Sequence, residues 1–294
     1  MAGKQPDFLT WAKTKGLHVN GIGLTHRPGR GRAVLARRRL KKGETILSVP
    51  IETIRSLHTV PNRVARKFPS HTSIHCLLAL DIALDTSADF APWRETMPKL
   101  EDFEAAQPFF WHEDLQALLP KPAKELLVKH QATFHEHWDL VSGAFPKLRR
   151  EGYLHSWFLA GTRSFYYETP KMLEYPVMDR LALMPAADLF NHAETGCEVS
   201  FTPTAYTVSA DRSYRPGEEI CISYGEHSND FLLTEYGFVL SDNCWDMVCI
   251  DDVVLDTLSP WQAAQMQKEG LLGRFLLDSN GIPCRKTRRR FGGV

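Results

Sequence analysis

The stretch CISYGEHSNDFLLTEYGF, residues 221–238, joins two different patterns at a polar corner. Before the corner, residues 218–224 alternate apolar and polar side chains, which predicts a strand with one buried face. After it, the Ser-Asn-Asp triplet at 228–230 is typical of a helix N-cap. We therefore expect residues 231–236 to form a short helix that ends at Gly237.

Two tyrosines flank that corner. Tyr224 ends the predicted strand and Tyr236 ends the predicted helix. A tyrosine is costly to bury unless its hydroxyl finds a hydrogen-bond partner. A chain that reverses direction between the two residues can bring both hydroxyls into one pocket; the alternative is a pair of core tyrosines beside a turn.

The rest of the chain predicts strands on both sides of a helical block. Residues 6–16 indicate a short amphipathic helix ended by a glycine. AVLA (33–36) and TILSVP (45–50) indicate two strands joined by a turn at KKGE (41–44). From 57 to 160, apolar residues recur at helical spacing.

Strands return after residue 176. CEVSF (197–201) and AYTVSA (205–210) alternate as strands do, and RPGE (215–218) has the proline and glycine of a type II turn. The order of strands, helices and strands predicts an α+β fold with mainly antiparallel pairing.

Composition narrows the class of protein. The chain has 294 residues, 43% hydrophobic and 24% charged, with a formal net charge of zero. The whole-chain charge therefore gives no argument for nucleic acid or an acidic membrane. With no membrane-length apolar run and no secretory signal, we expect reduced cysteines in the cytosol or nucleus.

Two groups of residues raise the question of a metal site. Cys244, Cys249 and Cys284 include no CxxC pair, so free thiols are favoured over zinc. His130, His135 and the nearby His137 lie in a helical pattern without a completing carboxylate or cysteine, and we expect them on the helix surface.

Four stretches occur in the order and spacing of a known family: GRGRAVLARRRLKKGETILSVP (29–50), TRSF (162–165), PAADLFNH (185–192) and GEEICISYGEHSNDFLLTEYGF (217–238). Together they resemble SET-domain methyltransferases, in particular the class with a helical insertion that includes the Rubisco large-subunit methyltransferase and fungal ribosomal-protein lysine methyltransferases. The resemblance covers about residues 5–255.

The resemblance implies an α+β fold of small antiparallel sheets with a C-terminal pseudoknot and a helical insertion. It divides the chain into an N-terminal part of the SET domain (1–56), the insertion (57–160), the C-terminal part of the domain (161–240) and a short extension (241–294). From the resemblance we also expect the long helical substrate lobe of the larger members to be absent or truncated.

The resemblance also implies S-adenosylmethionine as cofactor. Arg30, Gly31 and Arg32 match the glycine-rich loop whose backbone contacts it, although Ala33 stands where the family often has a second glycine. Arg163 matches the basic residue near the cofactor's carboxylate, and a surface ion pair is the alternative role.

The remaining site residues lie in the two last motifs. Asn191 and His192 match the pair that holds the cofactor's amino group and adenine, largely through backbone groups, and Asp188 either braces their loop or is structural. Tyr224 matches the catalytic tyrosine and Tyr236 the second tyrosine of the pocket. Phe238 packs against the cofactor, lines the channel, or belongs to the core.

The activity that the resemblance implies is methylation of a lysine in a non-histone protein, such as a ribosomal protein or translation factor, without a metal. Histidine methylation, a binding module without activity and a small-molecule enzyme are the alternatives. The partner is a protein and no membrane is expected. The basic run RKTRRR (285–290) is either a nuclear or nucleic-acid contact or a solvated tail.

Overall fold

The computed structural model describes residues 7–27, 31–283 and 287–288. The chain forms two compact units. The first comprises Met1–Phe103 and Ala132–Tyr224, and the second comprises Glu104–Gln131 and Gly225–Val294. Each unit is described by itself.

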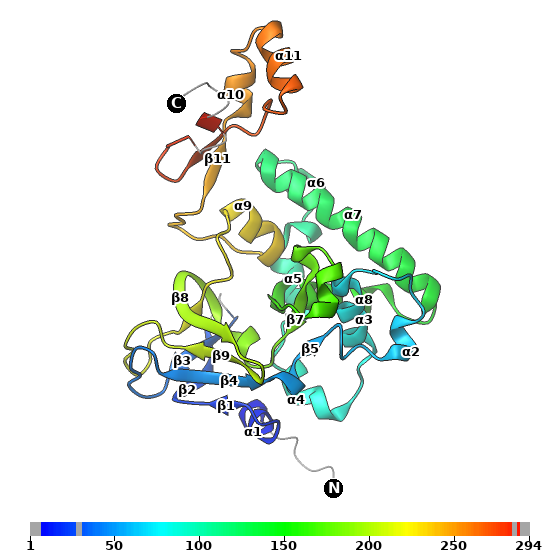
Figure 1. The fold of residues 1–294 in the computed structure, drawn as a ribbon, viewed down its shortest axis with the longest axis vertical. Coiled ribbons are helices and arrows are strands. Elements are labelled where there is room, and N and C mark those ends of the chain that lie inside the picture. Colours follow the sequence, from blue (N-terminus) through cyan, green and yellow to red (C-terminus); the bar gives the residue numbers. More distant parts are fainter. Residues whose placement is uncertain (1–6, 28–30, 284–286, 289–294) are drawn as a thin grey trace. The chain divides into compact units, whose positions relative to one another are not determined.

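The first unit is built on three small sheets (Figure 1). A five-stranded sheet has the order β1-β4-β9-β8-β10, a three-stranded sheet has the order β5-β7-β6, and β2 pairs with β3. The strands are β1 (His18–Val19), β2 (Ile22–Arg27), β3 (Gly31–Ala36), β4 (Thr45–Pro50), β5 (Arg55–Ser56), β6 (Ser164–Tyr166), β7 (Leu181–Leu183), β8 (Asn191–Phe201), β9 (Ala205–Ser209) and β10 (Cys221–Ile222).

Helices cover the sheets of the first unit. α3 packs against α8, and the contact buries Tyr153 and Trp157 of α8 and Leu78 of α3 almost completely. The helices are α1 (Phe8–Thr14), α2 (Asn62–Ala65), α3 (Ile74–Leu84), α4 (Ala91–Arg94) and α8 (Arg150–Arg163), while α5 (Leu100–Ala106) and α7 (Lys121–Ala144) contain residues of both units.

The second unit has a separate apolar cluster. Leu119, Ala123 and Leu127 form its buried centre, and Phe109, Trp111 and Leu233 pack against them. Its elements are α6 (Glu113–Gln116), α9 (Asn229–Phe231), a π-helix (Leu232–Tyr236), β11 (Met247–Cys249), α10 (Asp251–Leu255), α11 (Pro260–Lys268) and β12 (Leu276–Asp278). β11 and β12 pair antiparallel.

Several local predictions are confirmed. The N-terminal helix forms and Gly16 follows it with a φ of 78°, a left-handed conformation that glycine adopts without strain. Gly217 has a φ of 87° at the third position of the predicted type II turn. Gly237 has a φ of 79° and caps the π-helix, where a left-handed glycine commonly ends a helix.

Two strand predictions need correction. The strands at 33–36 and 45–50 do not pair with each other, because β3 forms a hairpin with β2 while β4 lies between β1 and β9. The strand expected at 218–224 shrinks to β10, which pairs parallel with β8 whereas the other pairs in the described ranges are antiparallel.

The prediction of surface histidines is wrong for two of the three. His130 and His137 are 9% and 7% exposed, and only His135 lies on the exposed face of α7. The reason is spacing: both occupy the stripe of buried positions that runs through Leu127, Phe134 and Val141. The indole N–H of Trp157 donates to Nδ1 of His137 at 3.0 Å, which satisfies the ring inside the core.

Candidate active site

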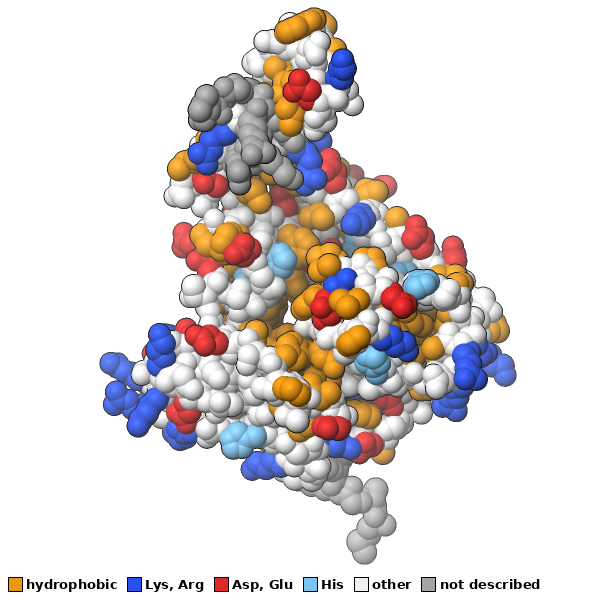
Figure 2. All heavy atoms as spheres, viewed as in Figure 1, with side chains coloured by type: hydrophobic (Ala, Val, Ile, Leu, Met, Phe, Trp, Pro, Cys, Tyr) orange, Lys and Arg blue, Asp and Glu red, His pale blue; other side chains and the backbone are white. Residues whose placement is uncertain are grey.

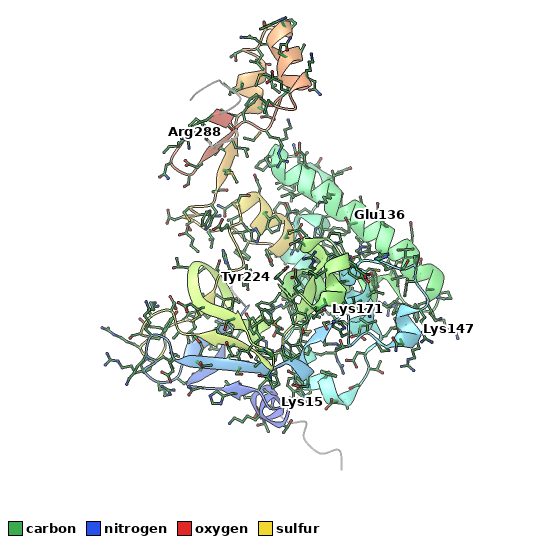
Figure 3. The ribbon with its side chains drawn as sticks, viewed as in Figure 1. Lys15, Glu136, Lys147, Lys171, Tyr224 and Arg288 are labelled. Carbon is green, nitrogen blue, oxygen red and sulfur yellow. The ribbon has the colours of Figure 1, made fainter. Side chains whose placement is uncertain are left out.

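Tyr224 lies at the end of β10, where two hydrogen bonds hold it against the start of β8. Its hydroxyl donates to the backbone carbonyl of Phe190 at 2.7 Å, and its backbone N–H donates to Nδ1 of His192 at 3.0 Å. Burial raises the pKa of Tyr224 to about 12, so the hydroxyl keeps its proton at neutral pH. The residue as a whole is half-buried, and Figure 3 labels it.

The approach of β10 to β8 depends on a glycine. Cys221 pairs with Asn191 and Ile222 pairs with Cys197, with an irregularity in register between the two pairs. A Cβ on Gly196 would lie 2.6 Å from the carbonyl oxygen of Cys221, far inside a normal contact distance. The close approach therefore brings Tyr224 beside Asn191 and His192, as the motif resemblance predicts.

Asp188 is buried in a short 3-10 helix (Ala187–Leu189) that immediately precedes Phe190 and Asn191. It is 5% exposed, and its Oδ2 accepts a hydrogen bond from the indole N–H of Trp93 at 3.1 Å. Its Oδ1 is buried and has no hydrogen-bond partner in the part of the chain that the structure describes. Burial raises the pKa of Asp188 to about 6, against the opposing charge of Arg163.

Arg163 ends α8 and reaches the same loop. Its Nη1 donates a hydrogen bond to the backbone carbonyl of Asp188. The side chain is half-buried, and among the residues described it forms no ion pair of the kind considered from the sequence. Its positive charge lowers the pKa of both Asp188 and Tyr224, opposing the effect of burial.

Asn191 connects the loop to strand β3. Its side-chain amide donates to the backbone carbonyl of Arg32 at 3.1 Å and to Oε1 of Glu219 at 2.8 Å. Gly31 begins β3 with a φ of 71°, and the guanidinium of Arg32 donates to the carbonyl of Glu95 at 2.8 Å. Arg30, the first residue of the predicted cofactor loop, lies outside the described residues.

Tyr236 and Phe238 belong to the second unit. Their ring centroids lie 6.2 Å apart, on either side of Gly237, and the ring of Phe231 lies 6.3 Å from that of Tyr236. Tyr236 ends the π-helix, a form that often occurs at functional sites. Their relation to Tyr224 stays a prediction, and so does the pseudoknot, because each concerns residues of both units.

Sequence reasoning missed three contributors to the site. Phe190 acts through its carbonyl, which any residue type supplies, so no side-chain pattern could reveal it. The sequence pattern indicated that Glu219 lies on the polar face of a strand. In the structure its side chain accepts a hydrogen bond from Asn191 and forms an ion pair with Arg27 at 3.4 Å. Trp93 is fully buried, and the need of a buried indole N–H for a partner was the available signal.

The structure also contains a cavity that is separate from these residues. It has a volume of about 460 Å³, belongs to the second unit, and is lined by residues of α7, α9, β11 and the segments beside them. None of the site residues expected from the sequence lines it. The described ranges contain no group of three or more histidine, cysteine or acidic residues placed to hold a metal ion. They also contain no helix long and apolar enough to cross a membrane.

Comparisons with known proteins agree with the motifs. The ribosomal lysine N-methyltransferase set11 of Schizosaccharomyces pombe is 25% identical over 282 residues, which cover 94% of this chain and 71% of that protein. Ribosomal lysine N-methyltransferase 2 of Saccharomyces cerevisiae is 23% identical over 215 residues, which cover 58% of this chain and 44% of that protein.

The fold also has a solved counterpart. The structure of Rubisco LSMT bound to AdoMet matches with a TM-score of 0.69 at 16% identity, over 95% of this chain and 67% of that one. This likeness confirms the α+β fold class expected from the sequence. The model of the SET domain family matches residues 31–225, which is more than half of the chain. The chain therefore belongs to the SET-domain family.

Proposed function

We propose that this chain is a protein-lysine N-methyltransferase that uses S-adenosylmethionine as its methyl donor. The observation that carries the proposal is the hydrogen bond of the Tyr224 hydroxyl to the Phe190 carbonyl, next to Asn191 and His192. The relatives support it, because two are named as ribosomal lysine methyltransferases and the solved counterpart is bound to AdoMet.

The residues present fit this cofactor. The amino-acid end of the cofactor carries an ammonium and a carboxylate. The ammonium suits the buried Oδ1 of Asp188, which has no hydrogen-bond partner in the described chain, and the carboxylate suits the guanidinium of Arg163. The backbone of Gly31 and of the Asn191–His192 pair would hold the remainder. S-adenosylmethionine supplies a methyl group on a positively charged sulfur.

The chain's own task is to orient a neutral amine. A lysine has a pKa near 10.4 in water, and an apolar site next to a cation lowers it. The lysine ammonium would first give up one proton to water. The neutral nitrogen would then accept the methyl group, with the electron pair of the broken carbon–sulfur bond left on sulfur, and the methylated product would carry the positive charge at neutral pH.

Tyr224 is suited to this orientation. A hydroxyl oxygen that donates one hydrogen bond still carries acceptor lone pairs, which can receive an amine N–H. Because its proton is held toward Phe190, the oxygen presents those lone pairs in a fixed direction. Correct alignment of reacting atoms contributes several kcal/mol to a transition state, on the order of 7–11 in favourable cases.

We propose a ribosomal protein or translation factor as the substrate, supported by the names of the two fungal relatives. The test incubates the full chain with tritiated S-adenosylmethionine and an extract from cells that lack it. A labelled band, followed by amino-acid analysis of the labelled residue, identifies the target and separates lysine from histidine methylation.

A matched control makes the test specific. Tyr224→Phe removes the hydroxyl that contacts Phe190, and Tyr206→Phe removes a buried hydroxyl that has no hydrogen-bond partner in the described chain. We expect the band to fade for the first variant and to persist for the second. Cofactor binding without any labelled protein would instead favour a binding module or a small-molecule enzyme.

A further inference from the structure

Two exposed loops of the first unit lie side by side although they are far apart in the sequence. Leu40 and Tyr214 exchange backbone hydrogen bonds of 3.0 and 3.2 Å, and Gly43 donates to the carbonyl of Ala210 at 2.7 Å. Both Leu40 and Tyr214 are buried. The loop 37–43 is therefore fixed against the loop 211–217 at one end of the five-stranded sheet (Figure 1).

These loops carry a concentration of positive charge that we call the basic patch: Arg37, Arg39, Lys41, Lys42 and Arg215. All five side chains are exposed, and within the described chain none has an acidic group at ion-pair distance. Figure 2 shows Lys and Arg side chains gathered at this end of the sheet.

The acidic groups near the patch are already engaged. Glu44 pairs with Arg38, and Glu218 pairs with Arg212 at 3.2 Å. Asp211 accepts from the hydroxyl of Tyr214 at 2.6 Å. Glu44 and Glu218 also accept hydrogen bonds from the backbone N–H groups of Lys41 and Arg215, at 3.0 and 2.8 Å, but neither forms an ion pair with a side chain of the patch that the structure describes. The patch therefore keeps a local excess of positive charge, although the whole chain has a formal net charge of zero.

The chemistry of the patch favours phosphate. Three of its five members are arginines, whose planar guanidinium groups match phosphate oxygens in a two-pronged geometry. The single aromatic residue of the two loops, Tyr214, is buried, so neither loop offers a ring on which a base could stack. Such a surface contacts a charged backbone without reading base sequence.

We propose that the basic patch binds the phosphate backbone of a nucleic acid independently of its sequence. The two loops are held by backbone hydrogen bonds before any ligand arrives, so little loop ordering opposes binding. The inference goes beyond methyl transfer and does not depend on it. Structured RNA and duplex DNA share this chemistry, and the test separates them.

The measurement is fluorescence anisotropy of the full chain with a short RNA duplex and a DNA duplex of the same mixed sequence. If the five cations of the patch replace counterions, affinity should fall on the order of 500-fold between about 50 and about 200 mM salt. Tighter binding of one duplex shows whether RNA or DNA is the preferred ligand of the patch. No binding of either duplex at the lower salt overturns the proposal.

Charge-reversal variants locate the surface. Arg39→Glu, Lys41→Glu and Lys42→Glu combined should weaken duplex binding at least about tenfold and lower the salt slope by about three. Their side chains form no hydrogen bond that the described structure shows, so the fold should be kept, and an unchanged Tm checks this.

The matched control changes the charge equally at three other exposed lysines: Lys13→Glu, Lys147→Glu and Lys171→Glu. Figure 3 shows Lys147 and Lys171 on the helical side of the first unit, away from the loops. The control should change affinity less than about threefold if the patch is the site. Equal losses in both variants, or equally tight binding of a glutamate-rich peptide, would overturn the proposal.

Discussion

The hydroxyl of Tyr224 and the backbone carbonyl of Phe190 lie 2.7 Å apart, so a main-chain group fixes the side chain that we propose for methyl transfer. The backbone N–H of the same tyrosine is held by His192. The two hydrogen bonds fix both the backbone and the side chain of Tyr224. Substitutions at Tyr224 and in the strands next to it should therefore affect its position in different ways.

Tyr224→Phe should lower turnover far more than cofactor affinity. The ring and the contact of the backbone N–H with His192 remain, while the oriented oxygen is lost, so we expect kcat to fall about 100-fold. The unpaired Phe190 carbonyl should cost about 1–3 kcal/mol of stability. Single-turnover kinetics and calorimetry with the cofactor measure the two effects, and equal losses in both would contradict the assigned role.

Tyr206→Phe should stabilise the first unit. Tyr206 is 1% exposed and its hydroxyl has no hydrogen-bond partner among the residues described. Removing a buried polar group in that state recovers part of a desolvation penalty of about 1–3 kcal/mol. Urea denaturation should show a higher midpoint at an unchanged slope, and a lower midpoint would mean that the hydroxyl is satisfied in solution.

Asp188→Asn should change how stability depends on pH. Burial raises the folded-state pKa of Asp188 from 3.8 to about 6, so the folded protein binds the proton more tightly than the unfolded chain. Stability from this group is present below pH 4 and is lost as the pH rises through 6, by up to about 3 kcal/mol.

The asparagine side chain does not titrate, so the variant does not lose stability as the pH rises through 6. Its amide oxygen can still accept the hydrogen bond from the indole N–H of Trp93. Denaturation of both proteins at pH 4 and pH 7 should therefore show the variant gaining relative stability at the higher pH. Parallel pH profiles for the two proteins would show that the pKa of Asp188 is not raised.

Gly196→Ala should disrupt the pairing of β10 with β8. Its Cβ would lie 2.6 Å from the carbonyl oxygen of Cys221 and 2.7 Å from Cα of Ile222, so backbone must move. We expect a loss of about 1–3 kcal/mol from overpacking, together with loss of methyl transfer, because Tyr224 follows directly.

Gly152→Ala provides the comparison for this change. Gly152 lies in α8 with open space around the new methyl group, so the same substitution should stabilise by about 0.5–1 kcal/mol. Thermal unfolding of both variants checks the pair, and a tolerated Gly196→Ala would show that the strands can separate without consequence.

The sequence was informative where chemistry lies in short motifs. Asp188, Asn191 and His192 occur within one stretch, so their proximity is local, and the resemblance to SET domains placed Tyr224 beside them before the structure did. The glycine and proline signals at residues 16, 217 and 237 were also reliable, because each depends on backbone conformation at a single position.

What the sequence did not reveal depends on long-range packing. The contact of Trp93 with Asp188 joins residues 95 positions apart, and the partner of the Tyr224 hydroxyl is a carbonyl without side-chain identity. His130 and His137 looked polar, yet their position on the buried stripe of α7 outweighed residue type. A formal net charge of zero likewise gave no sign of the basic patch: four of its residues lie within 37–42, and folding adds Arg215 from the loop 211–217.

The π-helix at Leu232–Tyr236 makes this segment sensitive to its length. A π-turn contains one residue more than the α-turn it replaces. Deleting a single residue there would let the backbone continue as a regular α-helix, but everything after it would rotate by about 100° about the helix axis. The rings of Tyr236 and Phe238 would then point in a new direction, although both side chains would still be present. Such a deletion would therefore test whether the orientation of these rings matters, without removing either ring.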